Sequence, residues 1–220
     1  MAGRAMAGRA MAGRAMAGRA MNAGFAGLLL FALVMSATPG PNNVMVTASA
    51  ARFGLRRTVP HIGGVAVGFS IMLLLVGLGL GAVFIAAPVL RRVLALASMV
   101  WMLWLAWAIA RSAAPSEDTA AAARPFTFVQ AALFQWVNPK AWMIAITVVA
   151  THALSGRVWL SALIIALVFL GVTLPVVGSW AAAGHALGRY LAGRRYRVFS
   201  VAMAVLLVVS LLPLIPEFLT

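Results

Sequence analysis

Proline interrupts two apolar stretches of this chain that are otherwise long enough to form membrane-spanning helices. The first interruption is Pro39-Gly40-Pro41-Asn42-Asn43, and the second is Asn138-Pro139-Lys140. A proline removes a backbone donor and clashes with the preceding turn, so it opens a helix at a cost of about 3 kcal/mol. In hydrocarbon, opened backbone survives only where protein buries it or where it lines a watery cavity. One interruption in each half of the chain is therefore typical of a transporter whose substrate site lies between the two.

The composition places the chain in a membrane. Apolar residues make up 64% of it and charged residues 9%, which is typical of an integral membrane protein and not of a soluble domain. Crossing a bilayer takes about 20 residues, and the apolar runs predict six helices. These cover approximately residues 23–51, 61–87, 93–110, 126–153, 159–183 and 198–215, the sixth being the shortest. The connections are short, so we expect residues 21–220 to form one transporter domain.

Residues 1–20 consist of four copies of Met-Ala-Gly-Arg-Ala. The segment lacks the apolar core of a signal peptide. We expect it to be a disordered low-complexity extension, or the product of a misassigned start for which Met21 is the alternative. A basic arm that binds anionic lipid is the other interpretation of the same arginines.

The net charge of +14 does not predict nucleic-acid binding, because the arginines lie at helix ends and in connections. Cytoplasmic loops of membrane proteins are enriched in basic residues. One side carries nine arginines, at positions 52, 56, 57, 111, 124, 189, 194, 195 and 197. The other side carries Arg91, Arg92 and Arg157, which predicts that both termini lie outside. The four arginines of residues 1–20 bring the comparison to nine against seven, so this orientation depends on leaving them out.

Three helices in each half are an odd number, so a duplicated half inserts into the membrane upside down. The matched interruptions of the first and fourth helices fit such a pair of inverted repeats. The predicted fold is an all-α integral membrane protein of six transmembrane helices in two inverted three-helix repeats, with helices 1 and 4 broken. Gly63, Gly64 and Gly68 in helix 2, and Gly171 and Gly178 in helix 5, are expected to let helices approach closely.

The second interruption has the residues of a helix start. Asn138 is a good N-cap, Pro139 fits the first helical position, and a residue before proline is pushed out of the helical region. A new helix is expected to begin at Pro139, with free N–H groups directed into the protein. In the first interruption Pro39 ends one helix, Gly40 permits unusual backbone angles and Pro41 begins the next helix.

These helix ends predict a zwitterionic substrate. Helix N-termini bind carboxylates, while the C-terminal carbonyl groups of the opposing half-helices suit an ammonium group. An amino acid carries both groups. We expect Asn42, Asn43 and Asn138 to supply polar contacts to it. Three further polar residues lie close to the interruptions and are candidates to line the cavity: Thr38, Gln130 and Gln135.

Lys140 is the only lysine of the chain, and it falls inside the fourth apolar run. Ionisable residues at such depth are costly and mark functional sites by default. No acidic residue lies in any predicted helix. The ammonium group is therefore expected to meet the substrate carboxylate, to lose its proton, or to snorkel to an interface. We favour a role in substrate binding or coupling over a lysine that merely reaches water from the end of a half-helix.

Other site chemistry is not indicated. The chain has no cysteine, and its three histidines are scattered, so neither a metal site nor a cofactor is predicted. No nucleophile–base pair or phosphate-binding loop appears, which argues against an enzyme. The rival functions are export of inorganic ions or of another small metabolite, and a membrane scaffold or sensor that transports nothing. Interruptions far apart in space favour the scaffold, whereas Asn42 and Lys140 facing one cavity favour transport.

At these positions the chain resembles the LysE/RhtB family of amino-acid exporters, over nearly everything after Met21. The resemblance is carried by Ser-Ala-Thr-Pro-Gly-Pro-Asn-Asn at 36–43, by Gly-Leu-Arg-Arg at 54–57 and by the glycine spacing of 63–68. In the second half it is carried by Phe-Gln-Trp-Val-Asn-Pro-Lys-Ala-Trp at 134–142. The resemblance implies six helices, efflux of amino acids or close derivatives across the bacterial inner membrane, coupling to the proton gradient, and a homodimer.

Overall fold

The computed structural model describes residues 23–112, 124–154 and 156–212, and the regular elements of these residues are all helices. The first is the helix Ala23–Ala37, which we call the N-terminal half-helix. It is followed by α2 (Pro41–Phe53), α3 (Leu55–Leu75), the π-helical η1 (Val76–Leu80), α4 (Gly81–Ala86), α5 (Pro88–Ala110), α7 (Phe128–Phe134), the 3₁₀ turn η2 (Gln135–Val137), α8 (Pro139–His152), α9 (Val158–Gly188) and α10 (Gly193–Val209). The expectation for residues 1–20 lies outside the described residues.

All six predicted regions contain helix, but fewer helices qualify as membrane spans. Three are long and apolar enough to cross a bilayer: Leu55–Ala86, Pro88–Ala110 and Val158–Gly188. A fourth span results if the N-terminal half-helix and α2, which are bent by 53° at the first interruption, count as one. In the second half, Asn138 divides α7 and η2 from α8, and α10 has only 17 residues. The all-α membrane fold is confirmed, whereas six spans in two inverted repeats stay a prediction.

Both interruptions are present and have the predicted local structure. The N-terminal half-helix ends at Ala37, and α2 begins at Pro41 after Gly40, whose backbone is extended with φ −169° and ψ 178°. At the second interruption Asn138 is also extended, with φ −89° and ψ 108°, and Pro139 occupies the first turn of α8. Proline suits this position because the first N–H groups of a helix have no partner within it.

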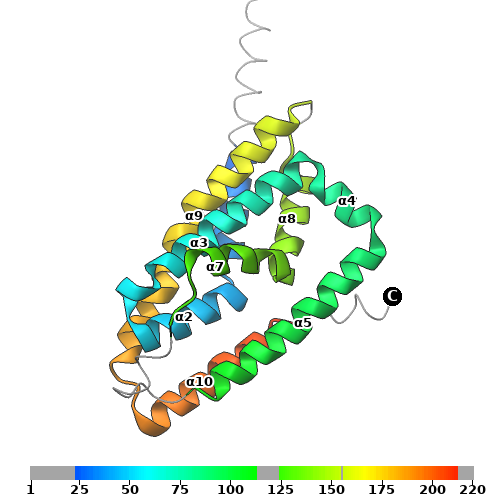
Figure 1. The fold of residues 1–220 in the computed structure, drawn as a ribbon. Coiled ribbons are helices and arrows are strands. Elements are labelled where there is room, and N and C mark those ends of the chain that lie inside the picture. The colour runs from blue at the N-terminus through cyan, green and yellow to red at the C-terminus, as the bar shows by residue number, and fades with distance from the viewer. Residues whose placement is uncertain (1–22, 113–123, 155, 213–220) are drawn as a thin grey trace, which may run out of the picture.

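The second predicted helix starts earlier than expected and bends near its C-terminal end, while its end at Ala86 matches the predicted residue 87. It begins at Leu55 rather than at residue 61 and continues through Pro60, which lies close enough to the start to cost few hydrogen bonds. It then passes into η1, where Gly79 has φ 124°, a conformation that glycine alone adopts readily. The chain bends here before α4 and α5 (Figure 1). Helix α5 begins at Pro88 rather than at residue 93, again with proline in the first turn.

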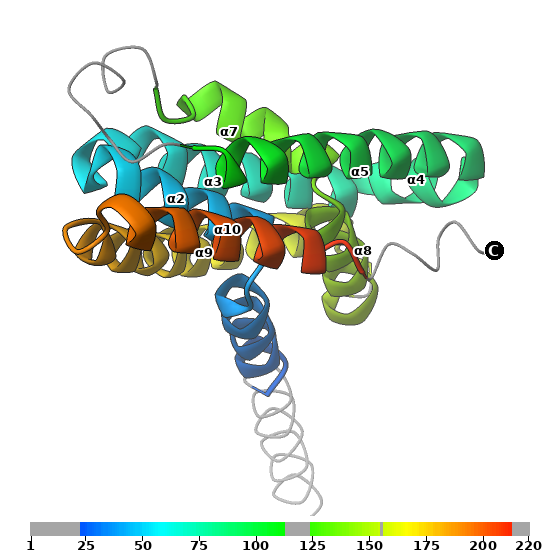
Figure 2. The same ribbon diagram turned by 90° about the horizontal axis from the view of Figure 1, so that it is seen from below.

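Helices α3 and α9 pack against each other at the centre of the bundle and hold the two broken helices. Helix α2 lies along α9, and α7 lies along α3 (Figure 1). Helices α5 and α10 form a separate pair at one side, and the N-terminal half-helix points away from the layer of long helices (Figure 2). The α3–α9 pair is therefore the support on which both interruptions are positioned.

Glycines bring the backbones of these helices into contact. On α3, a Cβ added at Gly64 would overlap the carbonyl oxygen of Phe128, and one at Gly68 would overlap the backbone of Ala132 in α7. On α9, the residues in the corresponding position are Gly184 and Gly188, whose added Cβ atoms would overlap the backbone of α2. Small residues allow such approach in lipid, where close packing replaces the hydrophobic driving force between helices.

The prediction for helix 5 named the wrong glycines. Nothing lies within 4 Å of a Cβ added at Gly171 or Gly178, so neither glycine mediates a close contact. The contacts lie at Gly184 and Gly188, near the C-terminal end of α9. The spacing of glycines along a helix does not indicate which face another helix covers, and this caused the error.

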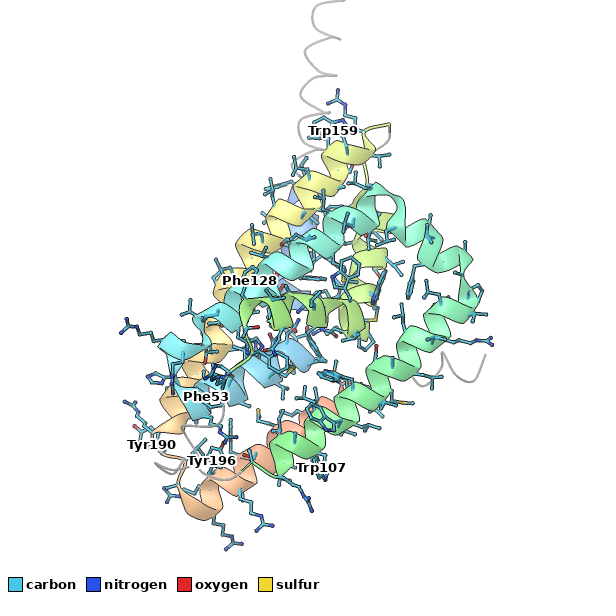
Figure 3. The ribbon with its side chains drawn as sticks, viewed as in Figure 1. Phe53, Trp107, Phe128, Trp159, Tyr190 and Tyr196 are labelled. Carbon is cyan, nitrogen blue, oxygen red and sulfur yellow. The ribbon has the colours of Figure 1, made fainter. Side chains whose placement is uncertain are left out.

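Aromatic residues and arginines mark the two ends of the bundle. Phe53, Trp107, Tyr190 and Tyr196 lie toward one end and Trp159 toward the other (Figure 3). Guanidinium groups lie over three rings at the first end: Arg52 over Phe53 at 5.3 Å, Arg111 over Trp107 at 4.8 Å and Arg189 over Tyr190 at 4.9 Å. These three arginines were predicted to share one side, and their rings lie at one end. Which end faces the cytoplasm stays a prediction.

We predict that Gly184→Leu destabilises the protein while Gly171→Leu, on the same helix, does not. A side chain at position 184 must displace the backbone of α2, and overpacking of this kind costs about 1–3 kcal/mol, whereas position 171 is open. The measurement is the thermal midpoint of the purified protein in detergent, followed by size-exclusion fluorescence. Equal midpoints for the two variants would contradict the close contact between α9 and α2.

Candidate functional site

The two interruptions meet in the structure through a pair of side-chain amides. Asn42 Nδ2 donates to Gln135 Oε1 at 2.8 Å, and Gln135 Nε2 donates to Asn42 Oδ1 at 3.2 Å. Gln135 is fully buried and also donates to the carbonyl oxygen of Ala131 at 2.8 Å. A buried amide with every strong group paired costs little, whereas an unpaired one is expensive. The pair therefore ties the start of α2 to the end of α7 across 93 positions of sequence.

Asn43 forms hydrogen bonds with the backbone on the other side of the first interruption. Its Nδ2 group donates to the carbonyl oxygens of Ser36 at 2.8 Å and Thr38 at 3.1 Å. The last carbonyl groups of a helix have no partner within it, so Asn43 supplies donors that the N-terminal half-helix lacks. The Ser36 hydroxyl lies 3.1 Å from that of Thr173 on α9, which fixes this end of the half-helix to the central pair.

The two new helix starts differ in their caps. Asn138 Oδ1 accepts from the Lys140 N–H at 3.1 Å, and the Asn138 carbonyl accepts from Ala141 at 3.0 Å. The predicted N-cap role of Asn138 is confirmed, but the expectation of free N–H groups at this start is wrong, because the cap uses them. Helix α2 begins at Pro41, and its N-cap residue Gly40 has no side chain to serve as a cap, so the N–H groups of Asn42 and Asn43 are its first donors.

Lys140 bonds to the opposite interruption. Its Nζ donates to the carbonyl oxygen of Thr38 at 2.7 Å and lies 3.4 Å from that of Pro39. These carbonyls follow the C-terminal end of the N-terminal half-helix, where the helix dipole favours a cation. We expected carbonyl groups at the half-helix C-termini to suit the ammonium group of a substrate, but in the structure the ammonium of Lys140 itself takes those of Thr38 and Pro39.

A small cavity lies where the interruptions meet. Its volume is about 40 Å³, and its lining includes Asn42, Asn43, Asn138 and Lys140. Since one water molecule needs at least about 10–15 Å³ of such space, the cavity admits a few waters and no amino acid. Asn42 and Lys140 thus face one cavity, which is the arrangement that favours transport over a scaffold.

A larger cavity lies on the other side of Lys140. Its volume is about 480 Å³, which falls within the range of pockets that hold small molecules. Thr38, Pro39 and Lys140 form one part of its lining, and Arg91 is a second cation in it. The stacked rings of Phe84 and Trp142, whose centroids lie 4.0 Å apart, and the residues Leu94, Ser98, Met143, Ile146, Thr147 and Ser210 contribute to the remainder.

The three residues predicted to line the cavity fall in different places. Thr38 lines the larger cavity, and Gln135 is bonded to Asn42 behind the smaller one. Gln130 lines neither: it is exposed at the start of α7, where it forms a capping box with Thr127. Arg91 was missed, because the sequence placed it in a connection. Pro88, which occupies the first turn of α5, is the local signal that could have placed the helix start before Arg91.

The chain is similar to known translocators and efflux proteins. The family model for the LysE type translocator matches residues 33–214, which include both interruptions. The cysteine/O-acetylserine efflux proteins of Escherichia coli strains HS and K12 and of Shigella sonnei are each 31% identical to the chain over 184 residues, which are 81% of this chain and 90% of each relative. No solved structure matches. The chain belongs to the family of LysE-type translocators, and it is a membrane transporter rather than an enzyme.

Proposed function

We propose that the chain exports an amino acid or a close derivative, by alternating access about a site formed where the two interrupted helices meet. The observation that carries the proposal is that Asn42 and Lys140, from different halves of the chain, line one cavity. Opened backbone inside a membrane protein is tolerated where it lines a cavity, and transporters place substrate sites at such points.

The site offers partners for both charged groups of an amino acid. Asn42, Asn43 and Asn138 supply amide groups, and the uncapped start of α2 supplies N–H groups for a carboxylate. Lys140 supplies a positive charge, and the carbonyls of Thr38 and Pro39 accept from an ammonium. Pro39, Gly40, Pro41 and Pro139 contribute by keeping the backbone open, which leaves these groups outside the hydrogen-bonding pattern of the helices.

The proposed transport cycle requires the small cavity to widen. At about 40 Å³ it is too small for an amino acid, while the adjoining cavity at about 480 Å³ is large enough. We infer that the substrate enters or leaves through the larger cavity and that the two halves rock about the interruptions. The proposal includes six spans in two inverted repeats in the bacterial inner membrane, with both termini outside, and a homodimer.

The names of the relatives give the first substrates to test. Cysteine and O-acetylserine are small amino acids with short polar side chains, and both head the panel for this chain. The experiment is counterflow in proteoliposomes with labelled amino acids, with and without a pH gradient. We expect exchange of at least one amino acid of the panel. We also expect faster net export with a pH gradient that drives protons in the direction opposite to the amino acid than without one. Failure of the whole panel would contradict amino-acid export and favour another small metabolite.

We predict that Lys140→Ala abolishes export while leaving membrane expression intact. The substitution removes the only cation among the described residues that line the small cavity. A charge-assisted hydrogen bond is worth about 1.5–3 kcal/mol, or about tenfold or more in rate. The measurement is the initial export rate, normalised to the protein in the membrane. Gln130→Ala, at an exposed residue away from both cavities, is the control and is expected to export normally. Normal export by Lys140→Ala would contradict the role.

A further inference from the structure

The ammonium group of Lys140 occupies a site that suits any primary ammonium. Thr38 O at 2.7 Å and Pro39 O at 3.4 Å are its acceptors, and both residues line the larger cavity. Among the described residues that line this cavity, none is acidic. In the part of the chain that the structure describes, there is no aspartate or glutamate at all. The carbonyl oxygens that hold Lys140 are acceptors of the kind that an incoming ammonium group also uses.

We propose that Lys140 takes the place of the substrate ammonium when the site is empty, and that the two ammonium groups exchange during transport. This inference rests on the proposed function. The substrate ammonium binds the carbonyls of Thr38 and Pro39, and the released Lys140 side chain turns to the substrate carboxylate. The carbonyls thus form an ammonium subsite, and the lysine serves as a carboxylate partner only after it has left them.

In this exchange each charged group of the substrate has a partner in the site, and the net charge of the site is unchanged. One ammonium replaces another on the same carbonyls, so no acceptor is left unpaired inside the membrane. The carboxylate that enters with the substrate then faces Lys140, with Arg91 as the second cation of the cavity. A ligand with an ammonium group alone displaces the lysine without neutralising it, and a ligand with a carboxylate alone leaves the lysine on its carbonyls. The site therefore favours zwitterions over either half of one.

Gly40 provides a way to disturb this contact without removing the lysine. A Cβ added at Gly40 would lie 2.8 Å from Cδ of Lys140 and 3.0 Å from its Nζ. The backbone of Gly40 is extended, so alanine adopts it without strain. Gly40→Ala is thus expected to push the lysine side chain away from Thr38. Gly178→Ala is the matched control, because nothing lies within 4 Å of the added Cβ there.

The test uses the fact that Lys140 is the only lysine of the chain. An amine-reactive ester is added to the purified protein in nanodiscs, and the modified peptide that contains residue 140 is quantified by mass spectrometry. A soluble one-lysine peptide in the same tube corrects for reagent consumed by added amines. The rate of modification at Lys140, relative to the peptide, reports release of the lysine and does not require transport.

Two arms of this experiment must agree. We expect Gly40→Ala to raise the relative rate about tenfold, the effect of losing one charge-assisted hydrogen bond, while Gly178→Ala leaves it unchanged. In the wild-type chain, saturating L-alanine methyl ester, which has an ammonium and no carboxylate, is expected to raise the rate. N-Acetyl-L-alanine, which has a carboxylate and no ammonium, is expected not to.

Each arm can overturn the inference. An unchanged rate in Gly40→Ala would show that the carbonyls do not hold the lysine. An unchanged rate with the methyl ester would show that added ammonium groups do not compete for them, and this arm remains decisive if Gly40→Ala fails to fold. Either result, obtained with a chain that still exchanges amino acids in counterflow, would reject the exchange and leave the proposed function standing.

Discussion

Backbone that proline has opened inside an apolar helix must find new hydrogen-bond partners, and the rest of the site depends on how it does so. The backbone groups at the interruptions find their hydrogen-bond partners in different ways. Asn138 caps its own helix, and Asn43 reaches back to the carbonyls of the preceding half-helix. Lys140 crosses from one interruption to the other. Only the start of α2 has no side-chain cap, which makes it the natural position for a carboxylate that the substrate brings.

These contacts need the two interruptions to be held at a fixed separation. Helices α3 and α9 hold them there. The glycines of α3 bring its backbone into contact with α7, and those of α9 bring its backbone into contact with α2. Because side chains do not intervene, small shifts of α3 against α9 move the interruptions as well. A packing arrangement of this kind connects the bundle to the site, as the proposed alternating access requires.

Sequence reasoning succeeded where a local rule decides the structure. Proline at the first helical position and asparagine as a cap correctly predicted the starts of α2 and α8. It failed where the answer depends on which segments meet. The partner of Lys140 lies 102 positions away. Gln130 caps the start of α7, whereas Gln135 meets Asn42. On α9, Gly184 rather than Gly178 meets α2. The bend at Gly79 is signalled in the sequence by the glycines at 77, 79 and 81, but glycines in an apolar helix also indicate close packing against another helix.

Labelling of a single cysteine tests directly whether substrate binds where the two interruptions meet. The natural chain has no cysteine, so Thr38→Cys introduces one thiol at the wall of the larger cavity. Thr151→Cys introduces one at an exposed position of α8 as the control. The measurement is the rate of maleimide labelling in proteoliposomes, with and without a transported amino acid that lacks a thiol. We expect the amino acid to slow labelling at position 38 and not at position 151. Equal labelling of Thr38→Cys with and without substrate would contradict binding where the interruptions meet.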